Sequence, residues 1–116
     1  MVFSMEIERS GVVQVGSESS FDETFSRLTA NVKNKGLTVF ATINFTDDAK
    51  TAGLEMNPTR MIIFGNPKSG TPLMIATPTL TIDFPLKVVV FQDNNRKVWL
   101  LYNSPKYLKK RHGFPD

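Results

Sequence analysis

One amphipathic helix, set among segments with strand periodicity, constrains this chain most. Ser20 followed by Glu23 forms a capping box, the signature of a helix start. Apolar side chains then recur at helical spacing, at Phe21, Phe25, Leu28 and Val32. Gly36 is a natural helix stop. Because the helix has a single apolar stripe, we expect residues 21–35 to lie on a surface and to face a sheet through that stripe.

The segments on both sides of this helix have the apolar pattern of strands. Residues 37–45 alternate, which would place Leu37, Val39, Ala41, Ile43 and Phe45 on one side. We expect the helix to pack against Val39 and Ile43. The other predicted strands are Met1–Glu8, Val12–Val15, Arg60–Phe64, Lys87–Phe91 and Lys97–Tyr102.

Short helices are predicted in the connections. Thr46-Asp47-Asp48 opens one, Thr71-Pro72 opens a second that runs to Thr77, and Ser104-Pro105 opens a third that ends at Gly113. Ser10-Gly11 and Asp93-Asn94-Asn95 are turn signals that make hairpins at both ends of the chain. The predicted fold is α+β: a mostly antiparallel sheet of about six strands, one long helix packed on one face, and short helices in the connections. The 116 residues suit a single domain, 1–116.

Composition excludes several classes of site. The chain has no cysteine and one histidine, so disulfides, thiolate nucleophiles and zinc sites are not expected. Asp47, Asp48 and Glu55 lack the spacing of a calcium loop. We predict no metal, no cofactor and no catalytic residue.

Location and macromolecular partners follow from hydropathy and charge. No stretch approaches the roughly 20 apolar residues of a membrane span, and residues 1–10 lack a signal-peptide core, so we expect a cytoplasmic protein without membrane contact. The net charge is +3, and the basic excess lies near the C-terminus, at Lys106, Lys109, Lys110 and Arg111. A solvated helix end explains those cations better than a nucleic-acid surface.

The stretch from Gly65 to Thr71 is the best candidate site. It leaves an apolar strand, enters a predicted helix, and contains Asn66 and Lys68. Free backbone N–H groups, a helix start and an ammonium group suit an anion. Candidate ligand-binding residues are therefore Gly65, Asn66, Lys68 and Thr71, with Arg60 included if it faces the same strand end. A rigid turn without a ligand explains the same residue types.

Two further features have structural explanations as well as functional ones. His112 lies in the last turn of the final helix, where it complements the helix dipole, and Asp83 precedes Pro85 as turn residues do.

The strand from Val98 to Tyr102 is apolar on both faces. Its sheet is therefore either covered on two sides or in contact with a partner chain.

Taken together, several short stretches resemble one prokaryotic family, the domain of unknown function 302. The stretches are Ala49, Gly53-Leu54, Pro58-Thr59, Phe64-Gly65-Asn66-Pro67, Gly70-Thr71, Leu73-Met74, Pro85-Leu86-Lys87, Val98-Trp99 and Tyr102-Asn103. The similarity covers about residues 43–103. It implies a compact α+β fold with an antiparallel sheet and a homodimer, but no activity. Many members have a histidine where this chain has Phe45, which can only pack.

Three functions remain open on this basis. The first is a non-catalytic, homodimeric module that binds a small molecule or anion at Gly65–Thr71. The second is a small enzyme using the same cleft, and the third is an oligomeric interaction domain without a small-molecule site. A cavity with convergent polar groups beside Asn66 would separate the first two from the third. A titratable group with a strongly shifted pKa in that cavity would favour the enzyme.

Overall fold

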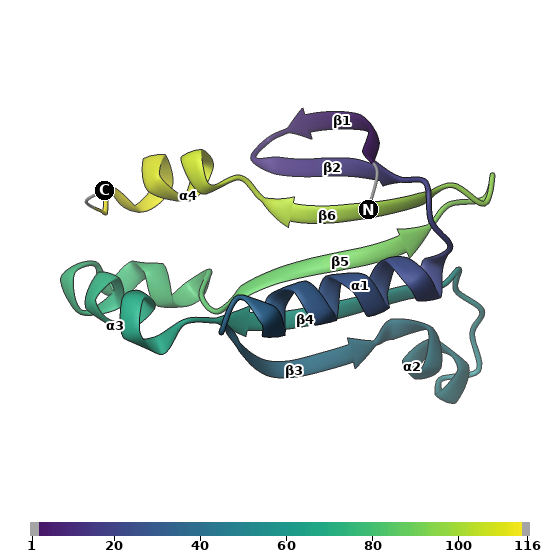
Figure 1. The fold of residues 1–116 in the computed structure, drawn as a ribbon, viewed down its shortest axis with the longest axis horizontal. Helices are drawn as coiled ribbons and strands as arrows, with labels where there is room; N and C mark the ends of the chain where they lie inside the picture. The colour runs from purple at the N-terminus through teal and green to yellow at the C-terminus, as the bar shows by residue number, and fades with distance from the viewer. Residues whose placement is uncertain (1–2, 115–116) are drawn as a thin grey trace.

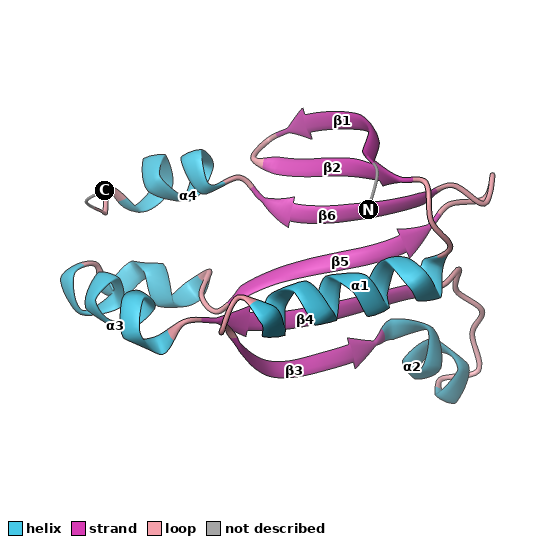
Figure 2. Cartoon of the chain, in the orientation of Figure 1, coloured by secondary structure: helices cyan, strands magenta, loops and turns pink. Residues whose placement is uncertain are grey.

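A strand hairpin lies near each end of the chain, and strands alternate with helices between them, in the computed structural model, which describes residues 3–114 (Figures 1 and 2). The strands are β1 (Phe3–Arg9), β2 (Val12–Ser17), β3 (Thr38–Asn44), β4 (Thr59–Gly65), β5 (Leu86–Gln92) and β6 (Val98–Asn103). The helices are α1 (Phe21–Asn34), α2 (Phe45–Thr51), α3 (Pro67–Ala76) and α4 (Pro105–His112), and a 3-10 helix η1 (Pro78–Ile82) follows α3. Met1 and Val2 of the predicted first strand lie outside the described residues.

The six strands form one antiparallel sheet in the order β1-β2-β6-β5-β4-β3. This confirms the α+β fold with a mostly antiparallel sheet of six strands. Helix α1 lies across one face of the sheet, over β4 and β5, whereas α2, α3 and α4 lie beyond the strand ends (Figure 1). The longest described helix is α1 with 14 residues, and α3 with 10 residues is longer than the one or two turns predicted.

The apolar stripe of α1 packs on the sheet as its spacing predicts. Phe25 and Val32 are buried, and Phe21 and Leu28 pack beside them. The strand residues beneath them are Ile62 of β4, Val88 and Val90 of β5, and Val98 and Leu100 of β6. Because opposed residues of antiparallel strands share a face, the registers of β4, β5 and β6 place all five on the α1 side.

The ends of α1 follow the sequence signals. Ser20 Oγ accepts a hydrogen bond from the Glu23 N–H, so Ser20 caps the start of the helix at the predicted place. The chain leaves the helix through Gly36, whose φ of +74° suits glycine. The short helix α4 likewise begins after Ser104 and ends at Gly113.

The alternation predicted for residues 37–45 is wrong beyond Val39. Val39 opposes Phe64 on the α1 side, but the register then shifts and Ala41 opposes Ile63. Phe40 is the extra residue of this β-bulge, and an extra residue transfers every later side chain to the other face. Ile43 therefore lies on the face away from α1, not under it. The strand also ends one residue early, because Asn44 Oδ1 caps α2 and Phe45 begins that helix.

The second helix start was also predicted at the wrong place. Thr71-Pro72 is not an N-cap, because α3 already begins at Pro67 with Asn66 as its cap. Both dipeptides offer a capping side chain followed by proline at the first helical position. The chain uses the first, and Pro72 is accommodated inside the helix without a backbone N–H to donate.

None of the helices within residues 3–114 is long and apolar enough to cross a membrane.

Candidate functional site

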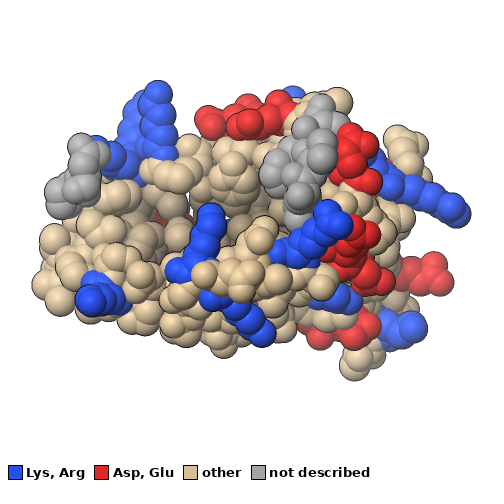
Figure 3. Space-filling view, viewed as in Figure 1, with Lys and Arg blue, Asp and Glu red and all other residues tan. Residues whose placement is uncertain are grey.

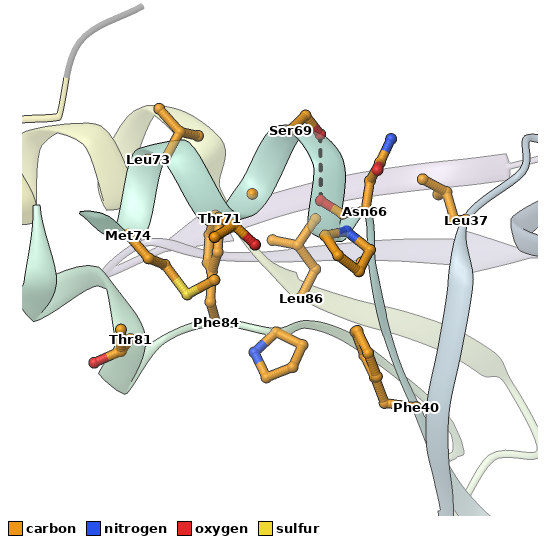
Figure 4. Close-up of a pocket in the computed structure, with 14 residues that line it drawn as sticks. Leu37, Phe40, Asn66, Ser69, Thr71, Leu73, Met74, Thr81, Phe84 and Leu86 are labelled. Carbon is orange, nitrogen blue, oxygen red and sulfur yellow. Dashed lines mark hydrogen bonds between the residues drawn. The ribbon is translucent and has the colours of Figure 1, made fainter. Parts of the chain in front are cut away.

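A cavity of about 580 Å³ opens where β4 ends and α3 begins (Figure 4). Its walls come from the start of β3, from α3, from η1 and from the approach to β5. Most of the lining is apolar, including Leu37, Phe40, Met74, Phe84 and Leu86. The polar side chains in the lining are those of Asn66, Ser69, Thr71 and Thr81, and none of the lining residues is charged.

The bulge in β3 supplies the strand side of this cavity. Phe40, the extra residue, is about half exposed at 49% and lies over the end of β4. A Cβ on Gly65 would come within 3.3 Å of Cε2 of the Phe40 ring, closer than most real contacts of this kind. Because glycine has no side chain, position 65 leaves room for the Phe40 ring. The ring forms one wall of the cavity.

The start of α3 supplies the opposite side. Asn66 Oδ1 accepts from the Lys68 N–H at 3.0 Å, and the Asn66 carbonyl oxygen accepts from the Gly70 N–H at 2.7 Å. Ser69 Oγ donates to the same carbonyl at 3.5 Å (Figure 4). The predicted Gly65–Thr71 loop is therefore the last residue of β4, the cap Asn66 and the start of α3, whose initial N–H groups are partly satisfied by that cap.

The structure divides the predicted site residues into two groups. Gly65, Asn66 and Thr71 line the cavity. Lys68 is exposed on α3 and does not belong to the lining. Arg60 lies at the other end of β4, in a separate hollow, so it contributes nothing at Gly65–Thr71.

The wall formed by η1 and the segment after it is braced by α4. His112 Nε2 lies 2.6 Å from Asp83 Oδ2, and the other ring nitrogen, Nδ1, lies 2.9 Å from Thr79 Oγ1. Arg111 also donates to the Asp83 carboxylate, at 3.0 and 3.2 Å. The hydrogen bond with His112, and then the charge of Arg111, hold the pKa of the Asp83 carboxyl below its ordinary value. His112 is therefore a bridge between two elements rather than only a helix-dipole partner.

Several cavity residues were missed by sequence reasoning. Phe40 was missed because the alternating pattern placed it on the opposite side of the strand from Val39 and did not indicate the β-bulge. Met74, Phe84 and Leu86 come from segments whose approach to β3 depends on the order of strands. One signal for them was present, because Phe84 and Leu86 are large apolar residues on either side of a proline, just before a strand.

Comparison with known proteins identifies the family. A family model described as "Domain of unknown function DUF302" matches residues 13–116. The chain belongs to the DUF302 family. The match is longer than the 43–103 stretch from which the resemblance was drawn. A crystal structure of an uncharacterized conserved DUF302 protein from Bacillus stearothermophilus has the same fold, with a TM-score of 0.77 at 22% identity, over 87% of this chain and 79% of that one.

Curated relatives of this DUF302 chain are longer proteins. A fluoride-specific ion channel, FluC 1, of Brucella suis is 43% identical over 103 residues, which are 89% of this chain and 41% of that protein. FluC 1 of Brucella abortus is also 43% identical over 103 residues, 38% of its length. The chain thus spans about two fifths of the curated relatives it matches.

Proposed function

We propose that this DUF302 domain is a non-catalytic module that binds a small molecule with an apolar body and a polar end. The observation that carries the proposal is the cavity of about 580 Å³ between β3 and α3. Its size falls in the range of ligand sites, about 300–1,000 Å³, and its lining is apolar with a few polar groups, as such sites usually are.

The lining favours a neutral amphipathic ligand over an anion. A buried anion needs a charged partner or several free donors. Lys68 is outside the lining, and Asn66 Oδ1 already caps α3. The hydroxyl of Thr71 and the amide nitrogen of Asn66 remain as donors that suit an alcohol, amide or carbonyl oxygen, whereas Thr81 Oγ1 already donates to the Pro78 carbonyl oxygen at 2.8 Å.

The same lining supports binding rather than catalysis. It holds no carboxylate, amine or imidazole to act as acid, base or nucleophile. His112 belongs to the bracing cluster, with its side chain only 4% exposed. The alternative of an enzyme in this cleft therefore lacks a titratable group at the place where it would be needed.

The second part of the proposal is a homodimer formed through the face of the sheet away from α1. Strand registers place Met61, Ile63, Val89, Phe91 and Leu101 together on that face, where each is partly buried. Of the described helices only α1 runs across the sheet, and it covers the other side (Figure 1). A contiguous apolar surface of this kind usually meets a partner, and the family resemblance favours a second copy of this chain.

We further propose that the domain acts in the cytoplasm, in keeping with the lack of cysteine. Fluoride conduction is not part of the proposal, because the match leaves more than half of each Brucella protein without a counterpart here.

The cavity is tested by adding 1-hexanol to labelled protein and recording amide NMR shifts. We expect shifts centred on residues 65–74 and 84–86. Hexanoate has the same chain with a carboxylate, and we expect it to bind more weakly because the lining has no cation. A concentration of about 20 mM detects binding far weaker than the ordinary micromolar range. If neither compound shifts the amides of these segments at that concentration, an interaction domain with no small-molecule site is favoured.

A further inference from the structure

A second hollow, of about 390 Å³, lies at the opposite end of β4 from the cavity. Asn44, Arg60 and Gln92 line it from the ends of three neighbouring strands, β3, β4 and β5. The starts of α1 and α2 complete it, with Asp22 and Asp47 among the lining residues. In contrast to the first cavity, most of the residues that line this hollow are polar or charged.

The sheet register brings the three strand residues to one face. Asn44 opposes Arg60 across β3 and β4, and Arg60 opposes Val90 across β4 and β5. Gln92 is two residues beyond Val90, so it points to the same side of the sheet. All three lie on the α1 side, where the apolar core ends and polar side chains replace it.

The guanidinium of Arg60 contacts two aromatic rings of α1 but has few polar partners. Its Cζ lies 5.3 Å from the ring centre of Phe21 and 5.1 Å from that of Phe25, which fixes the guanidinium over two aromatic faces. Its contact with an acid is to Asp22 Oδ1 at 4.0 Å, beyond hydrogen-bonding distance, and the Asp22 side chain is 89% exposed. Among the described residues no hydrogen bond engages the five N–H donors of this fork.

A guanidinium fork presented in this way matches a carboxylate, which it can hold through two parallel hydrogen bonds. Asn44 adds a donor beside it, because its Oδ1 accepts from the Asp47 N–H while its amide nitrogen makes no hydrogen bond among the described residues. Gln92 contributes another amide. These groups form the carboxylate half of a site.

The exposed acids supply the other half. Asp22 and Asp47 outnumber the single cation in the lining, and acidic side chains gather at the end of the molecule where α1 begins (Figure 3). Two carboxylates would repel a dianion such as phosphate but would attract an ammonium group. We propose that this hollow binds a small zwitterion with one carboxylate and one ammonium group, of the α-amino-acid class. The carboxylate is bound by Arg60, and the ammonium group faces Asp22 and Asp47.

A purely structural role for Arg60 makes a different prediction. In that case the guanidinium only covers the end of the core, and small solutes leave the hollow unchanged. L-alanine, propionate and ethylamine distinguish the two roles, since propionate is alanine without its amine and ethylamine is alanine without its carboxylate. Each is titrated into labelled protein up to about 20 mM, and amide shifts are mapped.

We expect L-alanine to shift residues 20–22, 44–47, 60 and 92, and each half-molecule to bind at least fivefold more weakly. Arg60→Gln should abolish the alanine shifts, and Arg60→Lys should weaken binding at least fivefold because lysine lacks the fork. Lys68→Gln removes an exposed cation outside both hollows and should leave binding unchanged. Thermal unfolding of the Arg60 variants checks that they fold.

Three results would overturn the assignment. Alanine shifts that survive Arg60→Gln in a folded variant would place binding elsewhere, and propionate binding as tightly as alanine would remove the role of the acids. An absence of shifts with all three compounds leaves Arg60 as a structural residue. The proposal for the first cavity is unaffected by these outcomes, because its probes and its amides are different.

Discussion

Asp83 and His112 are joined by a short hydrogen bond, with 2.6 Å between Oδ2 and Nε2, although they are 29 residues apart in sequence. The bond connects α4 to the end of η1, which forms one wall of the apolar cavity. The Asp83 side chain is 14% exposed and that of His112 is 4% exposed, so water competes poorly for this pair. This bond therefore connects α4 to a wall of the candidate site.

Asp83→Asn should lower the free energy of unfolding at pH 7 by about 1–3 kcal/mol, the cost of losing a charged hydrogen bond. The pKa of Asp83 is lowered in the folded state, chiefly by the hydrogen bond with His112. Its contribution to stability is therefore present above the unfolded pKa, about 3.9, and disappears as the pH falls through the lower folded value. In denaturant unfolding, the stability difference between wild type and variant should shrink as the pH falls below about 4, and a difference that stays constant down to pH 2 would contradict this.

Gly11→Ala should destabilise the protein by about 2–5 kcal/mol, from a strained left-handed backbone and from overpacking. Gly11 has φ +83°, and a Cβ there would lie 2.3 Å from Cγ of the Tyr107 ring. Gly53→Ala is the matched control, since its φ is +79° but its Cβ would meet nothing within 4 Å. Chemical denaturation should show the control losing only about 1–2 kcal/mol; equal losses would mean that Tyr107 does not pack on this turn.

Phe25→Ala should cost about 3–5 kcal/mol, because it removes a large side chain from the core beneath α1. Phe25 is 8% exposed. Phe40→Ala, at a ring that is 49% exposed, should cost less than half as much. Similar melting temperatures for the Phe25 variant and wild type would refute the packing of α1 on the sheet.

Phe91→Glu should convert the proposed homodimer into a monomer. Phe91 opposes Trp99 on the face away from α1, and a carboxylate in an apolar interface is strongly disfavoured. Ser26→Glu, at an exposed position of α1, is the control and should remain dimeric. Light scattering at micromolar concentration decides the matter, and a wild type with the mass of one chain would contradict the dimer.

The fold was predictable where local signals and burial agree. The capping box at Ser20, the stripe from Phe21 to Val32 and the turn at Asp93 each specify one local structure, and the sheet follows from their order. The bulge at Phe40 was not predictable, because a single extra residue leaves no mark in an apolar, β-branched stretch. The two candidate helix starts, at Asn66 and Thr71, have equivalent local chemistry, so only tertiary packing chooses between them.

The candidate site was predictable in its place but not in its chemistry. Asn66 and Thr71 were identified from turn and capping chemistry, and both line the cavity. Its apolar character comes from Phe40 and Phe84, which lie far from these residues in sequence and reach them through strand pairing. Arg60 was included only on the condition that it faces the same strand end as Gly65–Thr71, and it lines a hollow at the other end of β4.

The most direct test of the binding proposal is the dissociation constant of 1-hexanol for wild type and for Gly70→Leu. Gly70 lines the cavity, and a Cβ there would meet the Phe84 ring at ordinary contact distance, 3.7 Å, so a leucine side chain would occupy the ligand's space. Lys68→Leu adds the same side chain to α3 outside the lining and serves as the control. The account predicts at least tenfold weaker binding for folded Gly70→Leu, about 1.4 kcal/mol, and no change for Lys68→Leu. Equal affinity for all three proteins would contradict it.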